Sequence, residues 1–196
     1  MNCLAMASKL PLQTSITVDS SVVYHSTEED MAFFGFDAWA TKNAIPGCDN
    51  TPKIDLITIA HSKNTATWYI EVKDFRYLNI APSAKNTIDI GYTLEKKILG
   101  TSALLSHPGC MPDVKALYPH PAQTNFLFHY ELPLTAKSSA YFPAGYAATA
   151  LQYLSSKPTV RAMFHKMYVA HAGVMNNSAI YPWQINLLHN RKPSTP

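Results

Sequence analysis

The chain contains the run Trp68-Tyr69-Ile70-Glu71-Val72-Lys73-Asp74-Phe75-Arg76, which has the composition of a β-strand and yet carries several charged residues. Successive strand residues point to opposite sides of a sheet, so Glu71 and Lys73 are expected to share one surface with Tyr69. Trp68, Ile70 and Val72 then face the other way. The alternative interpretation is a solvated strand face on which Glu71 and Lys73 form a surface pair contributing about 0–1 kcal/mol.

A second strand is predicted just before this run. Leu56-Ile57-Thr58-Ile59 follows Asp55, and a hairpin through Ala60–Thr67 would bring Asp55 beside Glu71. Two carboxylates and one ammonium group would then lie together. Mg²⁺ prefers oxygen ligands and often takes only one or two carboxylates in addition to water and substrate phosphate. The cluster therefore suits hydrolysis of a phosphodiester bond, in which the ion holds the phosphate and activates water.

The order Asp55, fifteen intervening residues and Glu71-Val72-Lys73 resembles the PD-(D/E)XK (restriction-endonuclease-like) nuclease superfamily. The resemblance implies an α/β fold, a mixed central β-sheet flanked by helices, here with additional C-terminal helices. It also implies that Asp55 and Glu71 bind Mg²⁺ or Mn²⁺, that the Val72 carbonyl completes the metal shell, and that Lys73 is catalytic. The chain departs from the family name at Pro52, which lies three residues before Asp55 instead of directly before it.

Other segments extend the resemblance. A helix is predicted over 20–33, where Glu28 or Glu29 would supply the further acid that the family often carries before its first core strand; exposed helical carboxylates are the alternative. The first strand is predicted over 35–41. A helix over 87–106 contains Lys97-Ile98-Leu99-Gly100-Thr101-Ser102-Ala103, which is similar to a segment of some family members. Lys97 would contact phosphate there, or be a solvated helix lysine.

The remaining chain is predicted as a loop over 107–123, a strand over 125–132, helices over 144–155 and 158–174, and a strand over 181–188. In the second of these helices, Arg161, His165 and Tyr168 would share a basic and aromatic face. The domain organisation expected is a loosely packed arm over 1–18 and a single nuclease-like domain over 19–196. That domain would comprise a core over about 20–135 and a basic helical part over about 136–196.

Charge is distributed unevenly along the chain. The net charge is only +3, but all thirteen acidic residues precede Leu132, whereas Leu132–Pro196 contains six Lys and Arg residues and no acid. A polyanion is the natural partner of such a segment, although a basic tail that arose by composition drift is an alternative. The phosphate-binding residues expected are Arg76, Lys96, Lys97, Arg161 and Lys166.

Composition excludes several other classes. With 196 residues, 47% of them hydrophobic, the chain can bury a core and is not expected to be disordered. No apolar run reaches the roughly 18 residues of a membrane span, so a cytoplasmic protein without a membrane partner is expected. The three cysteines, Cys3, Cys48 and Cys110, are odd in number, far apart and without a Cys-x-x-Cys pair, so neither a disulfide framework nor a zinc ribbon is indicated. No phosphate-binding loop or dinucleotide motif is present in the sequence.

The function expected from these observations is that of a Mg²⁺- or Mn²⁺-dependent endonuclease, or phosphodiesterase, whose catalytic residues are Asp55, Glu71 and Lys73. Its expected substrate is DNA rather than RNA. A homodimer is an open alternative to a monomer. Two other functions stay open: a nucleic-acid-binding or assembly protein that keeps the fold without cutting, and an unrelated α/β protein that binds a small molecule.

Overall fold

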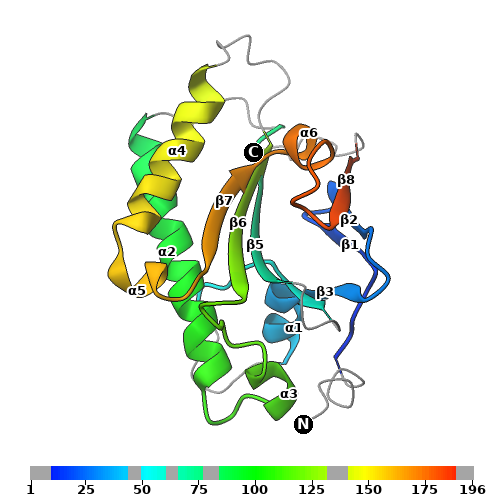
Figure 1. Ribbon diagram of the computed structural model, residues 1–196. Helices are drawn as coiled ribbons and strands as arrows, with labels where there is room; N and C mark the ends of the chain where they lie inside the picture. Colours follow the sequence, from blue (N-terminus) through cyan, green and yellow to red (C-terminus); the bar gives the residue numbers. More distant parts are fainter. Residues whose placement is uncertain (1–9, 44–49, 61–65, 77–83, 132–140, 189–196) are drawn as a thin grey trace.

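The computed structural model of the protein describes residues 10–43, 50–60, 66–76, 84–131 and 141–188. The chain forms a mixed α/β structure with two sheets and several helices (Figure 1). The five-stranded sheet has the order β3 (Met31–Gly35), β4 (Leu56–Ala60), β5 (Thr67–Asp74), β6 (Thr124–Glu131), β7 (Lys166–Ala170). The three-stranded sheet has the order β1 (Ser15–Val18), β2 (Val22–Ser26), β8 (Trp183–Leu187). The helices are α1 (Phe36–Lys42), α2 (Ala84–Ser106), α3 (Pro112–Lys115), α4 (Tyr141–Ser155), α5 (Pro158–Arg161) and α6 (Ala172–Met175).

Strand direction changes within the five-stranded sheet. β3, β4 and β5 pair in antiparallel fashion, whereas β5, β6 and β7 are parallel. A parallel pair cannot be joined by a tight turn and needs a crossover connection. The long helix α2 provides this connection between β5 and β6, and it lies with α4 on one side of the sheet (Figure 1).

The two faces of the five-stranded sheet pack against different layers. Tyr69 belongs to the apolar cluster that includes Ile98 of α2 and Leu154 of α4. Ile70 belongs to a second cluster with Trp183 of β8, on the side of the three-stranded sheet. The predicted alternation of side chains along β5 is confirmed by this division. Both faces of the strand are covered, which explains why its apolar residues are fully buried.

Two close approaches fix α2 in place. A Cβ atom on Gly91 would lie 2.7 Å from the ring of Tyr153, so this glycine lets α2 and α4 pack closely. A Cβ atom on Gly100 would lie 2.1 Å from the carbonyl oxygen of Pro52, so the helix touches the segment that leads into β4. The side chain of Thr101 accepts a hydrogen bond of 3.0 Å from the Ile54 N–H in the same segment.

Six predicted elements are confirmed in type and position by β4, β5, α2, β6, α4 and β8. The connection of the predicted hairpin at 61–65 lies outside the described residues, but the antiparallel pairing of β4 with β5 is confirmed, with Leu56 opposite Ile70. The predicted loop over 107–123 contains the short helix α3. No described helix is long and apolar enough to cross a membrane.

The helix predicted over 20–33 is wrong, because this segment forms β2, a turn and β3. Asp19 and Ser20 adopt left-handed backbone conformations with φ of 51° and 59° and turn the chain from β1 into β2. The β-branched pair Val22 and Val23 then favours a strand. The predicted arm over 1–18 is also wrong in part, since 15–18 form β1 and Leu10 is buried; residues 1–9 lie outside the described part.

The strand predicted over 35–41 is also wrong, because α1 occupies this position. Phe36 and Ala40, four residues apart, are the buried residues of the helix. A short apolar pattern fits both a strand and a helix. Here the helical spacing is the one that turns both buried side chains toward the core.

The long helix predicted over 158–174 divides into α5, β7 and α6. Pro158 begins α5 as predicted, but the helix ends at Arg161. The His165 N–H then donates to the Thr124 carbonyl at 2.7 Å, which starts the pairing of β7 with β6. Pairing with a buried neighbouring strand has overridden the helical spacing of the apolar residues.

Candidate active site

The candidate site lies where β4 begins beside β5. Asp55 directly precedes β4, and its carboxylate Oδ2 accepts a 2.7 Å hydrogen bond from the Val72 N–H of β5. The side chain of Asp55 therefore continues the pairing of the two strands beyond the Leu56–Ile70 pair. Glu71 immediately precedes Val72 and is fully buried. The interpretation of Glu71 as part of a solvated strand face is therefore wrong.

Two lysines neutralise the carboxylate pair. Nζ of Lys97 lies 2.6 Å from Oε1 of Glu71 and 3.5 Å from Oδ1 of Asp55. Nζ of Lys73 lies 3.0 Å from the same oxygen of Glu71. The arrangement brings together Asp55, Glu71 and Lys73, as the sequence predicts, and adds Lys97 from α2. The sequence indicated Lys97 only as a phosphate contact or a solvated lysine.

Burial and mutual charge shift the pKa values of these groups. Burial, followed by the nearby Asp55 carboxylate, raises the pKa of Glu71 to about 7. Burial also raises the pKa of Asp55, although Lys97 opposes the shift. Burial lowers the pKa of Lys97, but the charges of Glu71 and Asp55 outweigh it and the net pKa is raised. The site thus holds an ammonium group firmly and has one carboxyl group that titrates near neutral pH.

The oxygen atoms of the site suit a hard divalent cation. Oε2 of Glu71 is buried and finds no hydrogen-bond partner among the described residues. The N–H and C=O of one strand residue point to the same edge of the strand, so the Val72 carbonyl lies on the edge where its N–H meets Asp55. Within the described ranges, no group of three or more His, Cys, Asp and Glu side chains is placed to hold a metal ion. A bound Mg²⁺ or Mn²⁺ would therefore need water and substrate oxygens to complete its shell.

The fold holds Asp55 in position through its neighbours in sequence. The backbone carbonyl of Asp55 accepts a 2.9 Å hydrogen bond from the N–H of Phe36, at the start of α1. Ile54 donates to Thr101 of α2, and the carbonyl of Pro52 touches Gly100. The same helix therefore supplies Lys97 and supports the backbone that presents Asp55.

The structure does not bring the other predicted acids to the site. Glu28 and Glu29 lie exposed in the turn between β2 and β3, since no helix forms there. The structure also argues against Arg76 as a phosphate contact. Its guanidinium group is buried and binds both carboxylate oxygens of Asp74, at 2.9 and 2.8 Å, and the Ser21 carbonyl at 3.1 Å.

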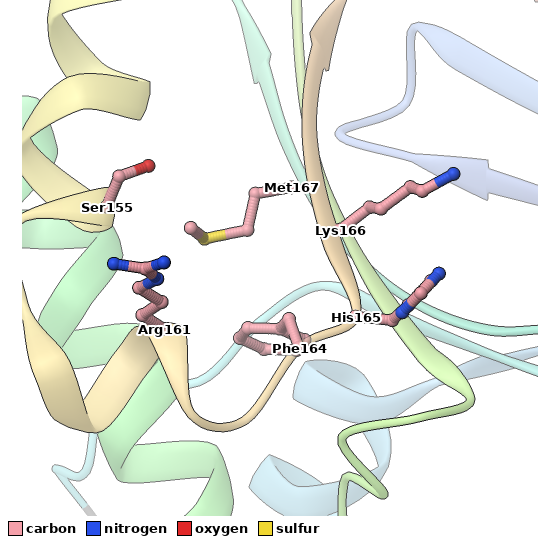
Figure 2. Close-up of a pocket in the computed structure, with 6 residues that line it drawn as sticks. All are labelled: Ser155, Arg161, Phe164, His165, Lys166 and Met167. Atoms are coloured by element: carbon pink, nitrogen blue, oxygen red, sulfur yellow. The ribbon is translucent and has the colours of Figure 1, made fainter.

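The other predicted phosphate contacts, Lys96, Arg161 and Lys166, are exposed. Lys96 stands over the ring of Tyr92, with 4.3 Å between Nζ and the ring centre. Arg161 and Lys166 both line a pocket of about 380 Å³, together with Phe164 and Met167. Figure 2 shows that Lys166 extends away from Arg161 on the other side of β7. No helix spans Arg161, His165 and Tyr168, so the single basic helical face predicted for them is wrong, whereas phosphate binding by Lys96, Arg161 or Lys166 stays a prediction.

A second polar cluster lies buried on the opposite face of the sheet and was not predicted. The hydroxyl of Tyr24 hydrogen-bonds to Nδ1 of His129, and Nε2 of His129 lies 2.8 Å from Oε1 of Glu131. The same oxygen accepts the Ala172 N–H at 2.6 Å. Burial lowers the pKa of His129, although Glu131 opposes the shift. The cluster joins β2, β6 and α6, and the available sequence signal was a His and a Glu two residues apart in an apolar strand.

Comparison of the chain with protein-family models, curated proteins and solved structures finds no match.

Proposed function

We propose that this protein is a divalent-metal-dependent nuclease with a restriction-endonuclease-like core, and that DNA is its substrate. The observation that carries the proposal is the geometry of the candidate site. Asp55 directly precedes β4, Glu71 lies in the adjacent antiparallel strand β5, and one ammonium group, that of Lys97, contacts both carboxylates. The two carboxylates offer oxygen ligands of the kind that Mg²⁺ takes in proteins.

The arrangement of the elements also supports the proposal. The PD-(D/E)XK resemblance implies a mixed central sheet flanked by helices. The five-stranded sheet is mixed and has α2 and α4 on one face, while its other face is covered by the three-stranded sheet. The motif residues lie at the start of β4 and within β5, where the resemblance requires them.

The roles of the residues follow from their positions. A bound Mg²⁺ or Mn²⁺ would polarise the scissile phosphate and acidify a water molecule. Asp55 and Glu71 would hold the ion, and the Val72 carbonyl would add a third protein oxygen. Lys73 is the more exposed of the two lysines, with 33% of its side chain accessible. It can therefore orient the attacking water and stabilise the charge that develops on the phosphate.

The direct test is an incubation with single-stranded, double-stranded and branched DNA and with RNA, each with Mg²⁺, Mn²⁺ or EDTA. Cleavage is expected with a divalent ion and not with EDTA. Asp55→Asn and Lys73→Met should abolish it without changing the circular dichroism spectrum, because neither removes core volume. Lys42→Met, at an exposed lysine in the last turn of α1 that belongs to no predicted site, is the control and should cut normally. Full activity of the Asp55→Asn variant would refute the site.

A second candidate is a protein that binds nucleic acid without cutting it. The observation in its favour is that the two lysines already neutralise the two carboxylates. The same incubation separates the candidates, since binding without cleavage in every metal would favour the second.

A further inference from the structure

Lys97 occupies the position that a shared cation would take. Its Nζ contacts Glu71 at 2.6 Å and Asp55 at 3.5 Å, whereas Lys73 contacts Glu71 alone. Only 17% of the Lys97 side chain is accessible, and its ammonium group reaches Glu71 of β5 from α2. The ammonium group is therefore a buried counter-ion of both carboxylates rather than a surface lysine.

The charge at the site sums to zero when both carboxyl groups are ionised. Two carboxylates face two ammonium groups, which leaves no net negative charge to attract a divalent ion. Even with the dielectric constant of water, a unit positive charge about 4 Å from a divalent ion repels it strongly enough to change its affinity more than tenfold. An ion that enters must therefore displace Lys97 or accept its repulsion.

We propose that Lys97 holds the cation position in the free protein and leaves it when a divalent ion arrives together with a nucleic-acid phosphate. This inference rests on the proposed nuclease function. The flexible four-carbon stem of lysine allows such a movement. The phosphate then becomes the new partner of the displaced ammonium group. Ion and nucleic acid therefore bind cooperatively, and each strengthens the binding of the other by the same factor.

The position of Lys97 makes metal binding depend on nucleic acid. Without nucleic acid, the carboxylates are stabilised by Lys97 and the ion binds weakly. With nucleic acid, the phosphate contributes negative charge and oxygen ligands of its own. The metal centre is thereby assembled only on the substrate.

The test is a calorimetric titration with Mn²⁺ at about pH 8, with and without a DNA duplex whose phosphorothioate backbone resists cleavage. The wild-type protein should bind Mn²⁺ weakly alone and more tightly with the duplex. Lys97→Met keeps the apolar stem and removes the charge. It should bind Mn²⁺ alone at least about tenfold more tightly than wild type, which corresponds to about 1.4 kcal/mol, and should gain less from the duplex. Lys42→Met, at an exposed lysine in the last turn of α1 that belongs to no predicted site, should match wild type.

Equal Mn²⁺ affinity of Lys97→Met and wild type would overturn the inference. So would a wild-type Mn²⁺ affinity that the duplex does not change, and this measurement needs no variant to fold. If wild type cuts DNA with Mn²⁺ and either result is found, only the role of Lys97 fails. If wild type neither cuts nor binds Mn²⁺ in the presence of the duplex, the proposed function fails with it.

Discussion

Replacing Gly100 with alanine should destabilise the protein, whereas the same replacement at Gly145 should stabilise it. Both glycines lie within long helices, α2 and α4, where alanine is intrinsically preferred by about 1 kcal/mol. At Gly145 an added Cβ would meet nothing within 4 Å, so this preference is expected in full. At Gly100 the added Cβ would lie 2.1 Å from the Pro52 carbonyl oxygen and 2.9 Å from Thr51.

The sign at Gly100 follows from these distances. Real contacts of a Cβ atom are not shorter than 3.0 Å, so helix and segment must separate by nearly 1 Å. The atom in the way belongs to the backbone and cannot rotate aside. Overpacking of this kind costs about 1–3 kcal/mol, and the upper end applies here. After the gain in helix propensity, a net loss of about 2 kcal/mol is expected.

Thermal unfolding followed by circular dichroism measures both effects. For a chain of this length, 1 kcal/mol corresponds to roughly 2–4 °C in Tm. Gly100→Ala should therefore lower Tm by about 4–8 °C, and Gly145→Ala should raise it by about 2–4 °C. A Gly100→Ala protein as stable as Gly145→Ala would refute the reasoning. It would mean that α2 does not press on the segment that carries Asp55.

Three further outcomes are expected. In EDTA, the pKa of Glu71 is about 7 in the folded protein and near 4.5 in the unfolded chain. The stability that this difference contributes is therefore fully present below about pH 4.5 and is lost as the pH rises through 7. Wild type should therefore lose roughly 3 kcal/mol relative to Glu71→Gln between about pH 5 and 8, as measured by urea unfolding. Arg76→Met should lower the free energy of unfolding by about 3–5 kcal/mol, because Asp74 is left buried without its cationic partner, while DNA affinity measured by fluorescence anisotropy stays unchanged. Reversing the charge of Arg161 and Lys166 together should weaken DNA binding and reduce its salt slope by about 0.9 for each phosphate that is no longer neutralised; unchanged affinity at every salt concentration would exclude both.

The sequence predicts the centre of the fold well because its signals there are local and strong. The apolar runs around Asp55 and Glu71 are joined by a short connection, and the antiparallel pairing follows from that proximity. The helix α2 is long enough for its period to be unambiguous. These three elements carry the residues of the candidate site.

The sequence predicts the periphery less well because tertiary pairing decides it. Residues 166–170 have apolar side chains at spacings that suit a helix. They nevertheless form a strand, because they pair in parallel with the edge of β6 that β5 does not occupy. Val22–Ser26 form a strand that is paired on both sides, by β1 and by β8. The contact of Lys97 with Glu71 spans 26 residues and depends on how the crossover helix lies on the sheet. No pattern within a short window reports such a contact.

The pairing of β2 with β8 delays the completion of the second sheet during synthesis of the chain. Tyr24 is opposite Ile185, so the second sheet cannot close until nearly all of the described chain has been synthesised. At 5–20 residues per second, about 160 residues separate the two strands by roughly 8–32 s of translation. Throughout that interval the aromatic face formed by Tyr24 and Phe33 lacks Trp183, which later packs against both rings. The strands of the central sheet can therefore pair one after another during translation, while one face of that sheet stays accessible to chaperones.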